Sequence, residues 1–319
     1  MSLKLNRRTV LAGMAALPLM GHAEDFPTRT ITIVVASAPG GIIDVIGRTL
    51  GNAISENLKT TVVVENKPGG AGHIGASFVA KSKPDGYTLL STSGATLTSG
   101  VVRNLNYDPV KDLVPVARVI VTPVILVVAA DSPYKSVSDL VNAARQKPGS
   151  VFFGSTNAGN STHIGGEMLN VMTGMGATHV PYKGSAPALQ DLIGGRIQFM
   201  FDTRPSTMPL VEGGKLRILA VSSQQRQKDL PNVPTVAETV PGFELEGWGG
   251  LFAPAATPLP VLEKLAAAQK SAIESPEFAK RLRMAGDIAY LPPVPARAYM
   301  MEDHERVSKI VQAANIRVD

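Results

Sequence analysis

Four loops of the sequence carry residues that could bind a small anion. Each loop joins the predicted end of a strand to the predicted start of a helix through small or hydroxylated residues, and the four loops span residues 37–41, 91–94, 155–163 and 182–186. Glycine lets the backbone approach a ligand closely, and the free N–H groups and the dipole at a helix N-terminus favour negative charge. Because ligands of open parallel sheets bind beyond the carboxyl ends of the strands, we expect these loops to line one cleft that binds a carboxylate.

A plainer explanation exists for each loop taken alone. Ser161 and Ser185 could be ordinary helix N-caps, and the glycines could be ordinary turn residues. For a single loop this explanation is the more common one. Four loops of the same design in one chain favour a shared cleft.

A few charged or polar side chains near these loops could contact the ligand. Asp44 and Arg48 lie four residues apart at a predicted helix start, where a helical ion pair is the simpler interpretation. His163 could bind the ligand or be a capped, partly buried histidine. Asp202 follows a predicted strand, and Arg204 could hold a carboxylate through two hydrogen bonds, although a surface arginine is the more common outcome.

Signatures of catalysis and of metal or cofactor binding are weak. The sequence contains no cysteine, no Gly-x-Ser-x-Gly motif and no His-x-His or His-x-x-x-His pair. Residues 70–75 match the Gly-x-Gly-x-x-Gly dinucleotide pattern, but Asn66-Lys67-Pro68-Gly69 separates the motif from its strand and the next strand lacks the expected acid. We therefore predict no catalytic residue, no metal site and no cofactor.

The order of the predicted elements indicates an α/β protein with a parallel sheet in each of two parts. Strands at 30–37, 61–65 and 87–92 alternate with a helix at 42–58 and a second helix that ends at about residue 81. A second series of strands (151–154, 179–181, 196–201 and 216–222) and helices (136–146, 161–172 and 185–193) follows. Between the two series, the strand-like stretch 114–130 is interrupted by Pro123, so we predict that it crosses between two lobes. Residues 247–250, which include the only tryptophan, Trp248, are the predicted return crossing, and helices at 260–283 and 295–314 close the chain.

The N-terminus is predicted to be a signal peptide of residues 1–23. Lys4, Arg7 and Arg8 precede an apolar stretch too short to span a bilayer, and Gly21-His22-Ala23 offers small residues for cleavage. The twin arginines partly match a twin-arginine signal, and the Sec route stays open as the alternative. We therefore expect a periplasmic product.

Without this segment the formal net charge falls from +5 to about +2, and the sequence has no cluster of basic residues. Both observations argue against nucleic-acid binding.

Longer motifs resemble the Bug family of periplasmic receptors that serve tripartite tricarboxylate transporters. They occur in the expected order from about Phe26 to the C-terminus. They are Pro39-Gly40-Gly41-x-x-Asp44-x-x-x-Arg48, Val64-Glu65-Asn66-Lys67-Pro68-Gly69-Gly70-Ala71-Gly72, Lys83-Pro84-Asp85-Gly86-Tyr87-Thr88-Leu89, Val180-Pro181-Tyr182-Lys183-Gly184, Leu230-Pro231-Asn232-Val233-Pro234-Thr235-Val236-Ala237-Glu238 and Gly247-Trp248.

The resemblance implies a type II periplasmic-binding fold, in which two α/β lobes joined by two crossing strands close on a ligand. It implies a small carboxylate held by backbone amides and hydroxyls, and delivery to the permease subunits of a membrane transporter. The expected lobes are 24–122 with 250–319, and 123–249. With Asp44 and Arg204 added, the predicted ligand-binding residues are Ala38, Pro39, Gly40, Gly41, Asp44, Thr92, Ser93, Gly94, Ser155, Asn157, Ser161, Thr162, His163, Lys183, Gly184, Ser185, Ala186, Asp202 and Arg204.

Two departures from the family pattern leave the identity of the ligand open. The family commonly has an aromatic residue just before the position of Ala38, where this chain has Ser37, and it usually lacks an arginine after Asp202. We expect a monomeric, non-catalytic receptor. The alternatives are a receptor that signals to a membrane sensor kinase and an exported enzyme of the same architecture.

Overall fold

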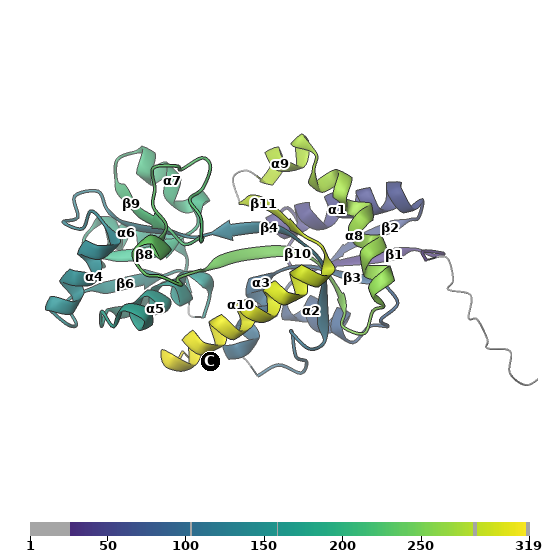
Figure 1. Ribbon diagram of the computed structural model, residues 1–319, viewed down its shortest axis with the longest axis horizontal. Coiled ribbons are helices and arrows are strands. Elements are labelled where there is room, and N and C mark those ends of the chain that lie inside the picture. The colour runs from purple at the N-terminus through teal and green to yellow at the C-terminus, as the bar shows by residue number, and fades with distance from the viewer. Residues whose placement is uncertain (1–25, 103, 158, 283–285, 317–319) are drawn as a thin grey trace, which may run out of the picture.

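The computed structural model describes residues 26–102, 104–157, 159–282 and 286–316, and the predicted signal peptide lies outside this range. Two sheets, each flanked by helices, lie side by side along the molecule (Figure 1). The six-stranded sheet contains β1 (Ile31–Val35), β2 (Val62–Asn66), β3 (Thr88–Ser93), β4 (Leu113–Pro123), β10 (Glu246–Pro254) and β11 (Asp287–Leu291). The five-stranded sheet contains β5 (Ile125–Ala129), β6 (Phe152–Ser155), β7 (Thr178–Pro181), β8 (Phe199–Asp202) and β9 (Leu216–Val221).

Ten helices in the described part of the chain cover the two sheets. They are α1 (Ile42–Leu58), α2 (His73–Ala80), α3 (Gly94–Thr98), α4 (Val137–Gln146), α5 (Ser161–Thr173), α6 (Ser185–Ile193), α7 (Arg204–Glu212), α8 (Leu259–Ile273), α9 (Pro276–Leu282) and α10 (Pro293–Ala313). None of the described helices has the length and apolar character needed to cross a membrane.

The sheet topology confirms two α/β lobes joined by two crossing strands. The strand orders are β11-β4-β10-β3-β1-β2 and β7-β6-β8-β5-β9. The chain leaves the first sheet at the end of β4, enters the second sheet at β5 after Val124, and returns through β10, which pairs antiparallel with β4 along its whole length. Pro123 therefore stands where the strand changes sheets, as the sequence predicts. The predicted lobe boundaries, 24–122 with 250–319 for one lobe and 123–249 for the other, stay a proposal, which this change of sheet supports.

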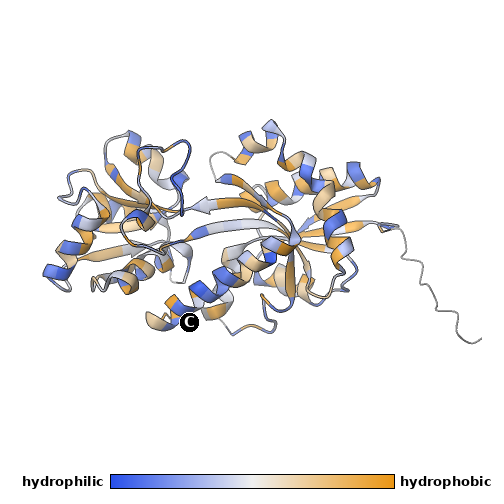
Figure 2. Ribbon diagram, viewed as in Figure 1, coloured by the Kyte–Doolittle hydropathy of each residue, from blue (hydrophilic) through white to orange (hydrophobic). Residues whose placement is uncertain are grey.

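Apolar residues on the strands build a separate core in each lobe (Figure 2). Ile31, Ile33 and Leu89 are fully buried in the first lobe, and Phe153 and Phe199 are fully buried in the second. Such continuous apolar strands are typical of parallel sheets that are covered on both faces. The fold thus needs no disulfide to hold either lobe.

The last helix, α10, connects the two lobes a third time. Met300 packs in the first lobe with Trp248 and Phe252, whereas Val307 and Ile310 pack in the core of the second lobe. Figure 1 shows the helix running beneath the crossing strands from one lobe to the other. The predicted lobe segment 250–319 did not anticipate this position.

Three elements differ from the sequence predictions. The single helix predicted at 260–283 is two helices, because Pro276 begins α9 and the Ser275 hydroxyl accepts a hydrogen bond from the backbone N–H of Phe278. Strand β11 and helix α7 were not predicted. Helix α7 starts with Pro205 in its first turn and contains Pro209, which obscures the helical pattern.

Candidate functional site

Asp44 organises the first loop of the predicted site rather than facing solvent. Its carboxylate accepts hydrogen bonds from the Gly40 backbone N–H (2.9 Å), Arg48 Nε (3.1 Å) and Asn66 Nδ2 (2.8 Å). Asn66 Nδ2 also donates to the Ser37 carbonyl, so the network holds both ends of the loop. These donors lower the pKa of Asp44 to about 2, although burial acts in the opposite direction as the largest single influence.

The loop of residues 155–163 in the second lobe is held by its own hydroxyl and amide groups. Asn160, not Ser161, is the N-cap of α5, and its Oδ1 accepts from the backbone N–H of His163 (3.1 Å). The Thr162 hydroxyl accepts from the Thr156 N–H (2.9 Å). The N–H of Gly184 donates to the Thr156 carbonyl (2.9 Å), so the loops at 155–163 and 182–186 form one unit.

Asp202 lies beneath the start of α6. Its Oδ1 accepts from the Ser185 hydroxyl (3.0 Å) and from the Thr203 N–H (2.7 Å), whereas the buried Oδ2 has no hydrogen-bond partner among the described residues. Burial raises the pKa of this carboxyl, because its charge is poorly solvated there. Ser185 is therefore not the cap of α6, a position that Gly184 occupies.

Arg204 is engaged within the second lobe. Its guanidinium forms an ion pair with Asp229, and Nη1 also donates to Gln227 Oε1 (3.4 Å). Only 12% of the side chain is exposed. A clamp on the ligand carboxylate, as predicted from the sequence, would require this ion pair to open.

The predicted ligand-binding residues divide into buried, partly exposed and exposed residues. Asp44, Thr92, Gly94, Ser155, Thr162, His163 and Asp202 are buried, and those with polar side chains support the loops. Ser93, Ser161, Gly184 and Ser185 are partly exposed, and Arg204 is partly buried in its ion pair. The exposed residues are Ala38, Pro39, Gly40, Gly41, Asn157, Lys183 and Ala186.

Sequence reasoning missed the supporting roles of Asn66 and Asn160. Asparagine is a preferred N-cap, so the signal for Asn160 was present.

Three helices that begin at these loops carry no side-chain cap, namely the short α3 and the longer α1 and α6. Gly41 precedes α1 and Gly184 precedes α6, and neither helix start receives a hydrogen bond from a side chain. The first N–H groups of an α-helix have no partner within the helix, and the helix dipole makes that end positive. The two lobes therefore each offer backbone donors suited to an anion.

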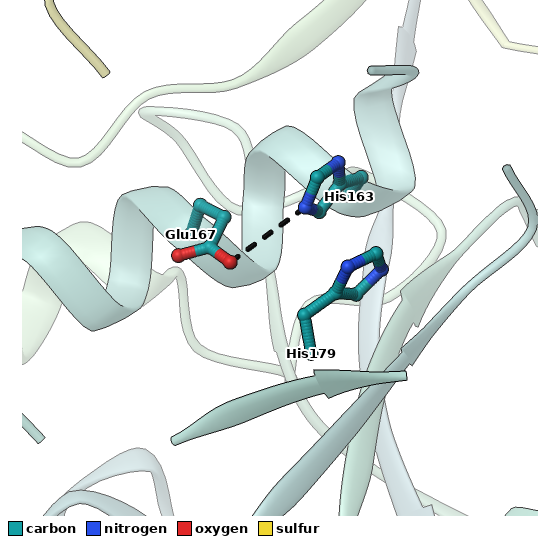
Figure 3. Close-up of side chains that lie close together, drawn as sticks. All are labelled: His163, Glu167 and His179. Carbon is teal, nitrogen blue, oxygen red and sulfur yellow. Dashed lines mark ion pairs between the residues drawn. The ribbon is translucent and has the colours of Figure 1, made fainter. Parts of the chain in front are cut away.

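A second polar cluster lies behind the loop of residues 155–163. His163, Glu167 and His179 place ligand-type atoms within 4.8 Å of one another (Figure 3). The two imidazole rings are stacked, with centroids 3.7 Å apart and planes inclined by 16°. Because the lone pairs of a ring nitrogen lie in the ring plane, nearly parallel rings do not direct them to one point.

The hydrogen bonds of His163 also oppose metal binding in this arrangement. The Gly159 N–H donates to His163 Nδ1 (2.9 Å), which leaves the proton on Nε2, facing Glu167 Oε1 at 3.6 Å. A metal-bound histidine has the opposite arrangement, with its free ring nitrogen donating. The cluster is better described as two stacked imidazoles that brace the loop.

We expect this stack to make the protein less stable in mild acid. Burial, reinforced by the nearby His163, lowers the pKa of His179 to about 4. The unfolded chain then binds more protons than the folded chain between pH 6.5 and 4, so stability falls as the pH drops through this window. With allowance for partial exposure of the ring, the loss is about 1–2 kcal/mol.

Urea unfolding at pH 7.5 and at pH 5 would measure this loss, and His179→Gln is the matched variant. The variant should lose less stability than the wild type between the two pH values. Equal losses in both proteins would contradict the assignment to His179.

Two cavities lie between the lobes. A small one, of about 30 Å³, brings Ala95 and Thr98 of the first lobe next to Gly159, Asn160 and Ser161 of the second. A larger groove, of about 980 Å³, contains none of the predicted ligand-binding residues; its lining includes Arg118, Gln227, Glu246, Asp287 and Tyr299. Burial and Glu244 raise the pKa of Glu246 in this groove to about 6.

Sequence comparison identifies the family. A family model described as tripartite tricarboxylate transporter family receptor (TctC) matches residues 46–316. The chain belongs to the TctC receptor family. It is 38% identical over 290 residues to the UPF0065 protein in the tcbD-tcbE intergenic region of Pseudomonas sp. strain P51, with 88% of this chain and 86% of that protein covered. It is 32% identical to the protein BugT of Bordetella pertussis over 96% of this chain and 95% of that protein. The resemblance to the Bug receptors is thereby confirmed.

Several solved structures, one of them described as a TctC solute-binding protein, share the fold. A TctC solute-binding protein from Polaromonas without ligand has a TM-score of 0.81 at 29% identity, covering 90% of this chain and 99% of that one. Rpa4515 of R. palustris with adipate has a TM-score of 0.69 at 34% identity, covering 92% and 99%. MatC from Rhodopseudomonas palustris with bound malate has a TM-score of 0.65 at 31% identity, covering 90% and 100%.

Proposed function

We propose that this TctC receptor works in the periplasm, captures a small carboxylate between its lobes, and delivers it unchanged to the permease of a tripartite tricarboxylate transporter. The observation that carries the proposal is the pair of uncapped helix N-termini, one in each lobe. Backbone donors at such positions bind a carboxylate without a basic side chain. Adipate and malate, which are bound by two related receptors, are both dicarboxylates.

The ligand contacts are proposed to come from the exposed and partly exposed members of the predicted set, with the buried members holding the loops. Gly41 and Ser93 would contribute from the first lobe, and Ser161 and the backbone N–H of Ser185 from the second, whereas the Gly40 N–H is held by Asp44. The TM-score is higher with the ligand-free relative than with the adipate-bound one, although the sequence identity is lower. This order supports an arrangement of the lobes like that of the ligand-free relative, which we take to be open and ready to accept a ligand.

A thermal-shift screen of residues 24–319 tests the proposal. The panel contains adipate, malate, succinate, citrate, glutamate and benzoate with the matching amides, and the protein is first unfolded and refolded to remove bound ligand. An acid present at 100 times its Kd should add about 2.7 kcal/mol of stability, whereas its amide should add little. Recovery of the acid unchanged, checked by NMR, would support a non-catalytic receptor.

Two results would contradict the proposal. If no acid raises the melting temperature, or if acids and amides raise it equally, carboxylate capture is wrong. Conversion of a bound acid would instead indicate an enzyme.

A further inference from the structure

The crossing strands divide the space between the lobes into two sides. On one side of β4 and β10 lie β3, β1 and β2 of the first lobe, and beside β5 on the matching side lie β8, β6 and β7 of the second. The predicted ligand loops follow β1, β3, β6, β7 and β8, so they all belong to this side. On the other side lie β11 and β9, and the groove of about 980 Å³ is lined there by β11 and by residues 223–228, which follow β9.

A direct hydrogen bond connects the lobes across this groove. Gln227, in the loop after β9, donates from Nε2 to Oδ2 of Asp287, the first residue of β11 (3.2 Å). Gln227 is only 5% exposed, and its Oε1 accepts from Arg204, which is itself paired with Asp229. The glutamine is therefore fixed within the second lobe, and Asp287 is its contact with the first. Figure 1 shows β11 and α9 facing the loops near α7 and β9.

We propose that Gln227 and Asp287 form a latch that holds the lobes open and thereby sets the affinity for the ligand from outside the ligand cleft. The inference rests on the proposed function. The ligand loops lie on one side of the crossing strands, and β9 and β11 lie on the other. A rotation about the crossing strands that brings the ligand loops together therefore moves β9 and β11 apart. The bond is then broken whenever the receptor closes. A contact made only in the open state lowers the closed population, and the apparent affinity falls by the same factor.

Gln227→Glu is the sharpest test, because it preserves the size of the side chain and its acceptor for Arg204. At pH 7.5 the new carboxylate faces Asp287 and turns attraction into repulsion. Combining it with Asp287→Asn exchanges the amide and the carboxylate and restores a hydrogen bond. Asp287→Ala, on an exposed residue, removes the bond with little risk to folding. Gln146→Glu, at the exposed end of α4, is the matched control for the added charge.

The distance between the lobes can be measured without knowing the ligand. The chain has no cysteine, so Lys67→Cys and Lys183→Cys can carry spin labels specifically. These positions follow the edge strands β2 and β7 on the ligand side. In refolded, ligand-free protein, pulsed electron resonance should show the ratio of short to long distances rising about threefold in Gln227→Glu and Asp287→Ala. The exchanged pair should return this ratio to that of the wild type, and Gln146→Glu should leave it unchanged.

Unchanged distances in Gln227→Glu and Asp287→Ala would overturn the latch, as would failure of the exchanged pair to restore the wild-type ratio. The readout does not depend on any acid of the thermal-shift panel. Failure of the latch and failure of carboxylate capture can therefore be distinguished.

Discussion

Replacing Gly250 with alanine should destabilise the protein by about 3 kcal/mol, because the crossing strands leave no room for a side chain at this position. A Cβ atom on Gly250 would lie 2.0 Å from the carbonyl oxygen of Ala117 and 3.3 Å from Cα of Arg118. Both neighbours are backbone atoms of β4, which pairs with β10 on one side and β11 on the other. The strand cannot move away without losing its hydrogen bonds on both sides.

Gly249→Ala is the control for Gly250→Ala. Its Cβ would meet no atom closer than 3.2 Å, so the expected cost is about 1 kcal/mol or less. Urea unfolding of both variants, followed by circular dichroism, compares the two costs. If Gly250→Ala unfolds at the same urea concentration as Gly249→Ala, the close approach of the crossing strands is not as tight as described.

The sequence predicted the elements whose pattern is local. Continuous apolar strands that end in glycine turns identified the parallel strands of both lobes, and Pro123 marked the change of sheet. The bridging position of α10 was not predictable in this way. Its residues Met300 and Val307 carry the same apolar signal although they pack in different lobes, and only the tertiary arrangement separates them.

The sequence also identified the site loops but not the orientation of their side chains. The sequence pattern favours Arg204 as a clamp because it does not reveal the ion pair with Asp229. That partner lies 25 residues later, in a loop whose position no local pattern predicts. The sequence does not decide whether His163 contacts the ligand or supports the loop. Its stacking on His179 is likewise a long-range contact that no local pattern predicts. Asp44 was the exception, since its i,i+4 spacing with Arg48 correctly indicated an ion pair.

Replacing Asp44 with alanine should cost about 2–3 kcal/mol of stability and abolish detectable carboxylate binding. Asp44 is 4% exposed, and removal of its carboxylate leaves the Gly40 N–H without its acceptor and Asn66 Nδ2 without one of its two acceptors. The loop of residues 37–41 would then lose the contacts that present the uncapped start of α1. Urea unfolding measures the stability, and isothermal titration with the acid that stabilises the wild type measures the binding.

Arg48→Met separates the shape of the loop from the ion pair. The Arg48 side chain is 47% exposed, so loss of its charge should cost less than about 1 kcal/mol. Binding should persist because the hydrogen bonds from Gly40 and Asn66 to Asp44 remain. The pKa of Asp44 is lowered from 3.8 to about 2, so its contribution is complete above pH 4 and is lost as the pH falls towards 2. The stability difference between the wild type and Asp44→Ala should shrink over the same interval. If Arg48→Met loses binding as completely as Asp44→Ala, charge at this helix start, and not the hydrogen-bonded shape of the loop, is what the ligand requires.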